Sequence, residues 1–182
     1  MLNPSFNSSR DNYYGKLDAP IEIIEYGDFQ CRKCAALFGQ IRILQDIMGD
    51  KLRFVYRHFP LLNIHPLSLE AAIASEAAAL QHKFWQMHSM IYHNQDKLSR
   101  ITLLELAEDI NMDMALFTSS REQECIFKKV VHDFNSAVMS GVTNTASFFI
   151  NGFLYTGKPD FKSLYKLCRY LLEYKKEREG FY

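Results

Sequence analysis

The stretch PIEIIEYGDFQCRKC, residues 20–34, contains the pattern from which the fold can be predicted. Residues 20–26 form a β-branched and aromatic run, and a Gly-Asp pair ends it, as a turn ends a buried strand. Cys31 and Cys34 follow directly. Because the apolar residues after Cys34 recur at three- and four-residue spacing, the stretch predicts a strand that leads into an amphipathic helix, with both cysteines at the junction.

The sequence on the C-terminal side predicts the rest of one sheet domain and a helical insertion. Residues 51–59 form a second strand-like run stopped by Pro60, which indicates a βαβ unit with a parallel strand pair. Residues 66–140 carry helical signals and no strand signal. Asn151-Gly152 separates two short apolar runs, the strongest short-range signal for a β-hairpin, and an amphipathic helix follows. The predicted fold class is α/β, thioredoxin-like (βαβ, then ββα), with a large all-helical insertion.

These patterns divide the chain into four parts. The polar, aperiodic start of the chain predicts an N-terminal arm, and the charged end predicts a C-terminal tail. The predicted boundaries are an arm at 1–17, a thioredoxin-like domain at 18–62 and 141–176, a helical insertion at 63–140, and a tail at 177–182.

The composition excludes several classes of protein. Of the 182 residues, 48% are hydrophobic and 14% aromatic, which indicates a compact fold and excludes a disordered chain. Lys and Arg together number 21, as do Asp and Glu, so the chain lacks the net charge that binding to nucleic acid needs. No run approaches the roughly 18 apolar residues of a membrane span, and residues 1–16 do not resemble a signal peptide. We expect no nucleic-acid partner, no membrane insertion, and a cytoplasmic location, or a periplasmic or extracytoplasmic one if a leader has been removed.

The Cys31-Arg32-Lys33-Cys34 motif carries the predicted chemistry. At the start of a helix, unpaired N–H groups and the positive end of the helix dipole stabilise a thiolate, so Cys31 is the expected nucleophile. Cys34, one turn further along, can close a disulfide with Cys31 and is the expected resolving thiol. Arg32 and Lys33 add positive charge, which should lower the pKa of Cys31 and make the disulfide a stronger oxidant.

Glu25 lies on the strand before this motif, where alternate side chains face the core. A carboxyl group buried near Cys34 would have a raised pKa and could shuttle the proton that Cys34 loses. The alternative is that Glu25 points outward at an edge or pairs with Arg57 or His58. The sequence alone leaves both interpretations open.

The motif and its neighbours resemble the DsbA-like thiol:disulfide oxidoreductases, in particular the branch also found fused to bacterial sodium/proton antiporters. The resemblance covers roughly residues 15–175. It is carried by five segments in the same order along the chain, namely DAPIEIIEYGDFQCRKC (18–34), RFVYRHFPL (53–61), His65-Pro66, KFWQMH (83–88) and GVTNTASFFING (141–152).

This resemblance implies a redox-active pair in which Cys31 attacks and Cys34 resolves, with Glu25 as the buried acid of the family. It further implies a substrate-binding loop at Thr145-Ala146-Ser147. The expected substrates are protein or peptide thiols and disulfides, with a partner that recycles the redox pair and with no bound cofactor.

The chain departs from the family at this loop. The family pattern there is Gly-Thr-Pro-Thr with a cis proline, whereas this chain has Asn144-Thr145-Ala146-Ser147. Because a cis bond before a residue other than proline costs about 2.5–4 kcal/mol, we expect a trans Thr145–Ala146 bond and weakened or altered binding of client peptides.

Other interpretations of the motif remain open. A zinc or iron–sulfur site would need two further ligands at a workable spacing, and none is evident, so we expect no metal. A non-catalytic module that binds a peptide or a partner could keep the fold and use the groove near Ala146. A glutathione-dependent transferase usually has a serine or a single thiol at the helix start, which the intact motif disfavours. Of the other cysteines, we expect Cys168 to be an inert core thiol and Cys125 to be exposed or at a helix end.

Overall fold

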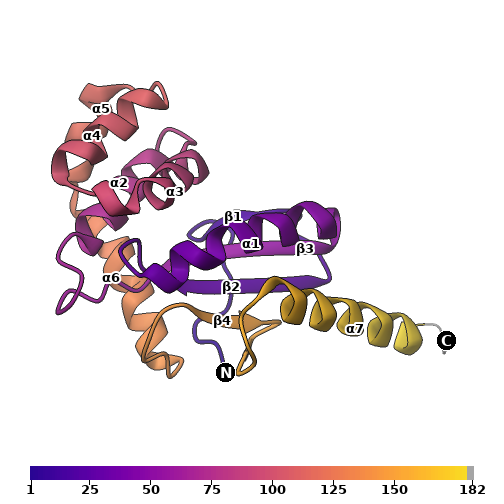
Figure 1. Ribbon diagram of the computed structural model, residues 1–182. Coiled ribbons are helices and arrows are strands. Elements are labelled where there is room, and N and C mark those ends of the chain that lie inside the picture. The colour runs from indigo at the N-terminus through magenta and orange to yellow at the C-terminus, as the bar shows by residue number, and fades with distance from the viewer. Residues whose placement is uncertain (180–182) are drawn as a thin grey trace.

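A computed structural model describes residues 1–179 and shows a five-stranded mixed sheet with the order β1-β3-β2-β4-β5 (Figure 1). The central strands β2 (Ile21–Gly27) and β3 (Leu52–His58) are parallel, as the βαβ pattern predicted. The other pairs in the sheet are antiparallel, and they involve β1 (Asn12–Tyr14), β4 (Ser147–Ile150) and β5 (Phe153–Leu154).

Helices cover both faces of this sheet. The helices α1 (Arg32–Met48) and α7 (Phe161–Glu179) pack on one face, in a core that includes Ile23 of β2. The helix α6 (Glu124–Met139) packs on the other face, in a second core that includes Ile24. Since successive strand residues point to opposite faces, the near-continuous apolar run in β2 follows from burial on both sides.

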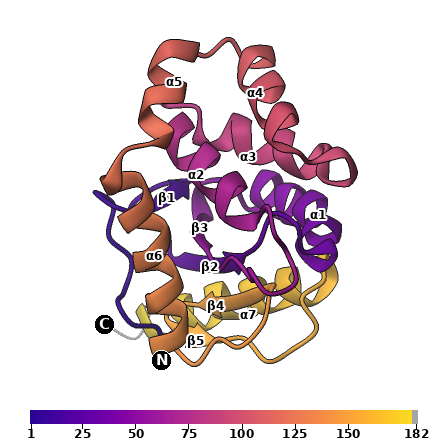
Figure 2. The ribbon, with the colours of Figure 1, turned by 90° about the vertical axis from the view of Figure 1, so that its left-hand side faces the viewer.

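The segment between β3 and β4 is helical throughout its regular structure, which confirms the predicted insertion. Four of its helices form a block beyond one end of the sheet, and α6 returns along the sheet toward β4 (Figure 2). Single-turn 3₁₀ helices lie at Gly49–Lys51 and Gln95–Lys97. The helices of the block are α2 (Ser68–Ala79), α3 (Phe84–His93), α4 (Arg100–Asp109) and α5 (Met114–Arg121).

The first 17 residues, which the sequence assigned to an arm, lie against the sheet. Leu2 is buried, and β1 pairs with β3. The Arg57 guanidinium donates hydrogen bonds to the carbonyl oxygens of Pro4 and Ser5 at 2.9 and 3.0 Å. Because the pairing of β1 and the bonds from Arg57 use backbone atoms of this segment, these contacts need no hydrophobic periodicity in its sequence.

The C-terminal helix α7 continues through Glu179, and residues 180–182 of the predicted tail lie outside the described residues. Cys168 is fully buried in α7, and Cys125 is exposed at the start of α6. Among residues 1–179, no helix combines the length and the apolar character that crossing a bilayer requires.

Candidate active site

Cys31 and Cys34 lie at the junction that the sequence predicted. Cys31 is the N-cap residue of α1 and Cys34 is in its first turn. Both are free thiols, and their exposed fractions are 7% and 1%. The site therefore presents one sulfur near the surface and a second sulfur behind it.

The two thiols differ in acidity. The pKa of Cys31 is lowered to about 5, chiefly by the hydrogen bond from the Cys34 thiol, with smaller contributions from the Thr145 side chain and from the backbone of Cys34 and Lys33. The same hydrogen bond, together with burial and the nearby charge of Glu25, raises the pKa of Cys34 well above its ordinary value. Cys31 is therefore the thiolate at neutral pH, and Cys34 holds its proton.

The side chains of Arg32 and Lys33 are exposed on the first turn of α1. The contribution of Lys33 to the acidity of Cys31 comes from its backbone N–H group at the start of the helix. Such groups have no partner within the helix and point toward its N-terminus, where they stabilise a thiolate.

The loop at residues 145–147 lies against the nucleophile. The Cys31 thiol is 3.6 Å from the carbonyl oxygen of Thr145, and Thr145 is buried. Ala146 packs against the core on the α1 side, and Ser147 begins β4 opposite Tyr26. The fold therefore brings together the motif and the loop that the resemblance assigned to substrate binding.

The Thr145–Ala146 peptide bond is cis, so the expectation of a trans bond was wrong. That expectation rested on the general preference of residues other than proline. Here the loop is fixed at both sides, by the Cys31–Thr145 contact and by the pairing of β4 with β2, and these surroundings set the local conformation.

Glu25 is buried in β2 with an exposed fraction of 4%, and no salt bridge to it occurs among residues 1–179. The two partners that the sequence suggested for Glu25 form ion pairs with other residues. Arg57 pairs with Asp11 at 2.9 Å, and His58 contacts Glu76 at 2.8 Å. Burial, reinforced by the charge of Cys31, raises the pKa of Glu25 to about 8. The carboxyl group is therefore mostly protonated at neutral pH and can exchange a proton there.

Two further residues hold the turn between β2 and α1, and the sequence analysis assigned this role to neither of them. Asp28 is buried and accepts hydrogen bonds from the backbone N–H groups of Gln30 and Leu61 and from the hydroxyl of Ser68. The Gln95 side chain donates to the carbonyl oxygens of Phe29 and Cys31, at 2.8 and 3.1 Å. The role of Asp28 could be inferred from the sequence, because an aspartate often begins a turn. No local pattern indicates the role of Gln95.

One group of side chains within residues 1–179 could hold a cation, and it includes neither cysteine. Ligand atoms of His58, Glu76 and Asp133 lie within 4.8 Å of one another. The Lys129 ammonium is 2.5 Å from Asp133 and 3.5 Å from Glu76, and so already supplies positive charge to this group. The group therefore connects β3, α2 and α6 through charge pairing.

Comparisons with known proteins agree with this geometry. A sequence profile described as Thioredoxin matches residues 7–168. The chain is 36% identical over 168 residues to the Na(+)/H(+) antiporter NhaA 1 of Mycolicibacterium gilvum, covering 90% of this chain and 27% of that protein. It is 35% identical over 155 residues to the Na(+)/H(+) antiporter NhaA 3 of Salinispora tropica, covering 85% of this chain and 24% of that protein. The chain thus spans about a quarter of the length of these curated relatives.

Solved structures show the same fold. BdbD from Bacillus subtilis, in its oxidised form, has a TM-score of 0.80 at 19% identity and covers 92% of this chain and 95% of its own. The α-DsbA1 protein of Wolbachia pipientis has a TM-score of 0.78 at 23% identity, with 94% of each chain covered. The catalytic domain of Proteus mirabilis ScsC has a TM-score of 0.80 at 14% identity, with 92% of each chain covered.

Proposed function

Because the chain belongs to the DsbA-like branch of the thioredoxin family, we propose that it is a thiol–disulfide oxidoreductase that exchanges disulfides with protein or peptide thiols. The observation that carries this proposal is the unequal thiol pair, in which the pKa of Cys31 is about 5 and the pKa of Cys34 lies well above its ordinary value. A nucleophile that is ionised at neutral pH, beside a buried thiol that is not, suits stepwise exchange through a mixed disulfide.

In the oxidising direction, a client thiolate attacks Cys31 Sγ of the disulfide. The Cys31–Cys34 bond breaks, and Cys34 leaves as a thiolate that takes up a proton, for which Glu25 is the donor. A second client thiolate then attacks the client sulfur of the mixed disulfide, and Cys31 leaves as a thiolate. Two electrons pass from the client to the pair, and the low pKa of Cys31 favours its departure. A second redox couple must then reoxidise the pair.

The surface beside Cys31 offers a place for an extended client. A groove of about 460 Å³ is lined by Lys33, by the loop at residues 141–148, and by Tyr155. It contains Thr145, whose carbonyl oxygen contacts the nucleophile. We propose that a client cysteine reaches Cys31 from this groove, with the loop at Thr145, Ala146 and Ser147 beneath it.

Cysteine variants test the proposal most directly. Cys31→Ser should abolish exchange with a model peptide disulfide. Cys34→Ser should leave an enzyme that attacks but accumulates mixed disulfides, which mass spectrometry detects, because Cys34 releases the client. Cys125→Ser is the matched control, since Cys125 is exposed outside the site, and it should exchange at the parent rate.

Thiol titration separates this proposal from a non-catalytic binding module. Mild reduction of the oxidised protein should release two thiols, and the reduced protein should reduce the model disulfide. A protein that released no thiols and left the model disulfide intact would contradict the proposal. Alkylation of Cys34 before Cys31 in the reduced protein would contradict the assigned roles.

A further inference from the structure

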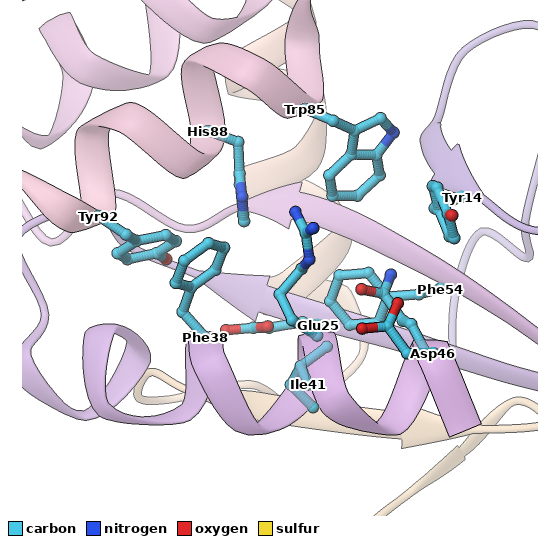
Figure 3. Close-up of a pocket in the computed structure, with 11 residues that line it drawn as sticks. Tyr14, Glu25, Phe38, Ile41, Asp46, Phe54, Trp85, His88 and Tyr92 are labelled. Carbon is cyan, nitrogen blue, oxygen red and sulfur yellow. The ribbon is translucent and has the colours of Figure 1, made fainter. Parts of the chain in front are cut away.

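Two hollows lie near the redox pair, and they differ in size and in lining. The first lies between α1 and α3 beside Glu25 and has a volume of about 80 Å³ (Figure 3). Pockets for organic ligands occupy roughly 300–1,000 Å³, so this hollow is too small for a peptide segment. The second is the groove of about 460 Å³ beside Cys31, which we name the client groove, and within the described residues it shares no lining residue with the first. Recognition of a client therefore depends on the side chains of the client groove.

The lining of the client groove carries one charged side chain within residues 1–179, that of Lys33. Most of the lining comes from residues 141–148, which include no Asp, Glu, Lys or Arg. Next to the lining residue Pro159, Lys158 and Asp160 pair with each other at 2.8 Å, so their charges offset. Lys33 is exposed and has no salt-bridge partner in the described part of the chain. The net charge that a client meets in this groove is therefore that of one ammonium group.

The position of Lys33 on α1 brings this charge close to the reacting atoms. Lys33 lies in the first turn of α1, two positions after Cys31, and it shares the client groove with Thr145, whose carbonyl oxygen contacts the Cys31 thiol. During exchange the client cysteine is bonded to Cys31 Sγ, so the client residues on either side of it lie over this surface. Lys33 attracts an acidic side chain held there and repels a basic one, and such charge pairing favours one class of partner over another.

We propose that Lys33 is a specificity-determining residue, which selects client segments with acidic residues next to the reacting cysteine. This inference rests on the proposed function and names the substrate class for it. Arg32 is exposed on the same turn of α1 but does not line the client groove. The two cations of the motif therefore differ in role, because both lie near the Cys31 thiolate but only Lys33 faces the client.

Three peptides test this selection on the oxidised protein. They are identical except that glutamate, glutamine or lysine occupies the two positions on each side of a single cysteine. The measured step is the attack of the peptide thiolate on Cys31 Sγ, which forms the mixed disulfide and releases Cys34 as a thiolate that takes up a proton. Rapid quench and mass spectrometry give the rate of this step for each peptide.

The ratio of the glutamate-peptide rate to the lysine-peptide rate is compared between the parent and Lys33→Gln. Flanking charges also change the acidity of the peptide's own thiol, but this effect is the same for both proteins and cancels in the comparison. We expect the ratio to be on the order of fivefold higher in the parent, which is the size that exposed charge pairs reach. The difference should shrink in about 0.5 M salt, because salt screens exposed charges.

Charge reversal separates the client groove from the general field of the motif. Lys33→Glu should lower the ratio below that of Lys33→Gln. Arg32→Glu is the matched control, because it makes the same change of charge on the same turn outside the groove, and its ratio should stay close to that of the parent. Either variant can change the acidity of the redox pair, but this changes the rates of all three peptides alike and leaves the ratio unaltered.

Two results would overturn the inference. One is an equal ratio in the parent, Lys33→Gln and Lys33→Glu, and the other is a fall in Arg32→Glu as large as that in Lys33→Glu. If the glutamine peptide did not react with the parent at all, the proposed function itself would be refuted, so the two failures are distinguishable.

Discussion

Glu25 and Arg57 are buried ionisable residues on adjacent central strands, but their surroundings differ. In the register of β2 and β3, Glu25 lies opposite Tyr56, and the next pair is Tyr26 with Arg57, so the two residues face opposite sides of the sheet. The Arg57 guanidinium makes two hydrogen bonds to Asp11, both at 2.9 Å, and one to the Tyr26 hydroxyl at 3.0 Å. With its bonds to two backbone carbonyls, every N–H direction of the guanidinium is used. Glu25 has no salt bridge among residues 1–179.

This difference separates a structural charge from a reactive one. A fully paired buried cation keeps its charge at every accessible pH and fixes the segments that it contacts. A buried acid without a counter-ion keeps its proton until the pH approaches 8, where a small change in its surroundings shifts its ionisation. The first arrangement holds the N-terminal segment, and the second suits proton transfer.

The largest expected effect comes from breaking the ion pair between Asp11 and Arg57. In Asp11→Asn the shape of the contact is kept but Arg57 becomes an uncompensated buried charge. We expect the free energy of unfolding to fall by about 3–5 kcal/mol, measured by urea denaturation at pH 7. The folded fraction should retain its exchange rate, since Asp11 does not contact the cysteines.

The double variant Asp11→Asn/Arg57→Met sharpens this prediction. Removing both charges leaves no ion to desolvate, so we expect part of the lost free energy of unfolding to return. If Asp11→Asn lowered the free energy of unfolding by less than about 1 kcal/mol, the pair would behave like an exposed ion pair. Arg57 would then not be the structural charge that distinguishes its side of the sheet from the side of Glu25.

The next effect is a gain in free energy of unfolding, and it comes from replacing Glu25. The folded pKa of Glu25, about 8, lies above the ordinary value of 4.5. The stabilising contribution of its proton is therefore complete below pH 4.5 and is lost as the pH rises through 8. Because the amide that replaces the carboxyl group does not titrate, Glu25→Gln should gain up to about 3 kcal/mol in free energy of unfolding relative to the parent between pH 4.5 and pH 7, at about 1.4 kcal/mol per unit.

Denaturation of the reduced protein at both pH values measures this gain. Glu22→Gln is the matched control on the same strand. Because Glu22 pairs with Arg53 at 2.5 Å, this substitution should lower the free energy of unfolding instead of raising it. An equal free-energy difference between Glu25→Gln and the parent at the two pH values would show that Glu25 does not titrate in this range.

A smaller effect is expected at the nucleophile. The rate of Cys31 alkylation by iodoacetamide should follow a titration with its midpoint near pH 5. Cys34→Ala removes the hydrogen bond that contributes most to this acidity, so the midpoint should rise by about one pH unit or more. A midpoint that stays near pH 5 in this variant would assign the acidity to the helix start instead.

The smallest expected effect concerns the exposed cations. Arg32→Ala/Lys33→Ala should raise the midpoint of the same titration, because positive charge near the thiolate favours it. Both side chains are exposed, so solvent and salt screen them, and the rise should be about half a pH unit or less. A larger rise, abolished in high salt, would show that these side chains contribute more than the hydrogen bonds to Cys31.

The parts of the fold that could be predicted are those with a short-range pattern of apolar residues in the sequence. The sequence predicted a strand at 20–26, where the structure has β2 at Ile21–Gly27, and it predicted the cysteine pair at the start of the following helix, because a β-branched run and helical periodicity are short-range signals. The sequence indicated that Glu25 could be a buried acid, but it left open a pairing of Glu25 with Arg57. The true partner of Arg57, Asp11, lies in a segment without periodicity, and only the fold brings the two together.

The order of the elements along the chain matters for synthesis. Cys31 and the residue whose carbonyl oxygen faces it, Thr145, are 114 positions apart. At the usual elongation rate of about 5–20 residues per second, the thiol pair would leave the ribosome roughly 6–23 s before its covering loop. Throughout that interval β2 would lack β4 along one edge, leaving unpaired backbone groups next to two uncovered sulfurs. We therefore expect nascent chains, and fragments that end before this loop, to be oxidised and to associate through that edge more readily than the finished protein.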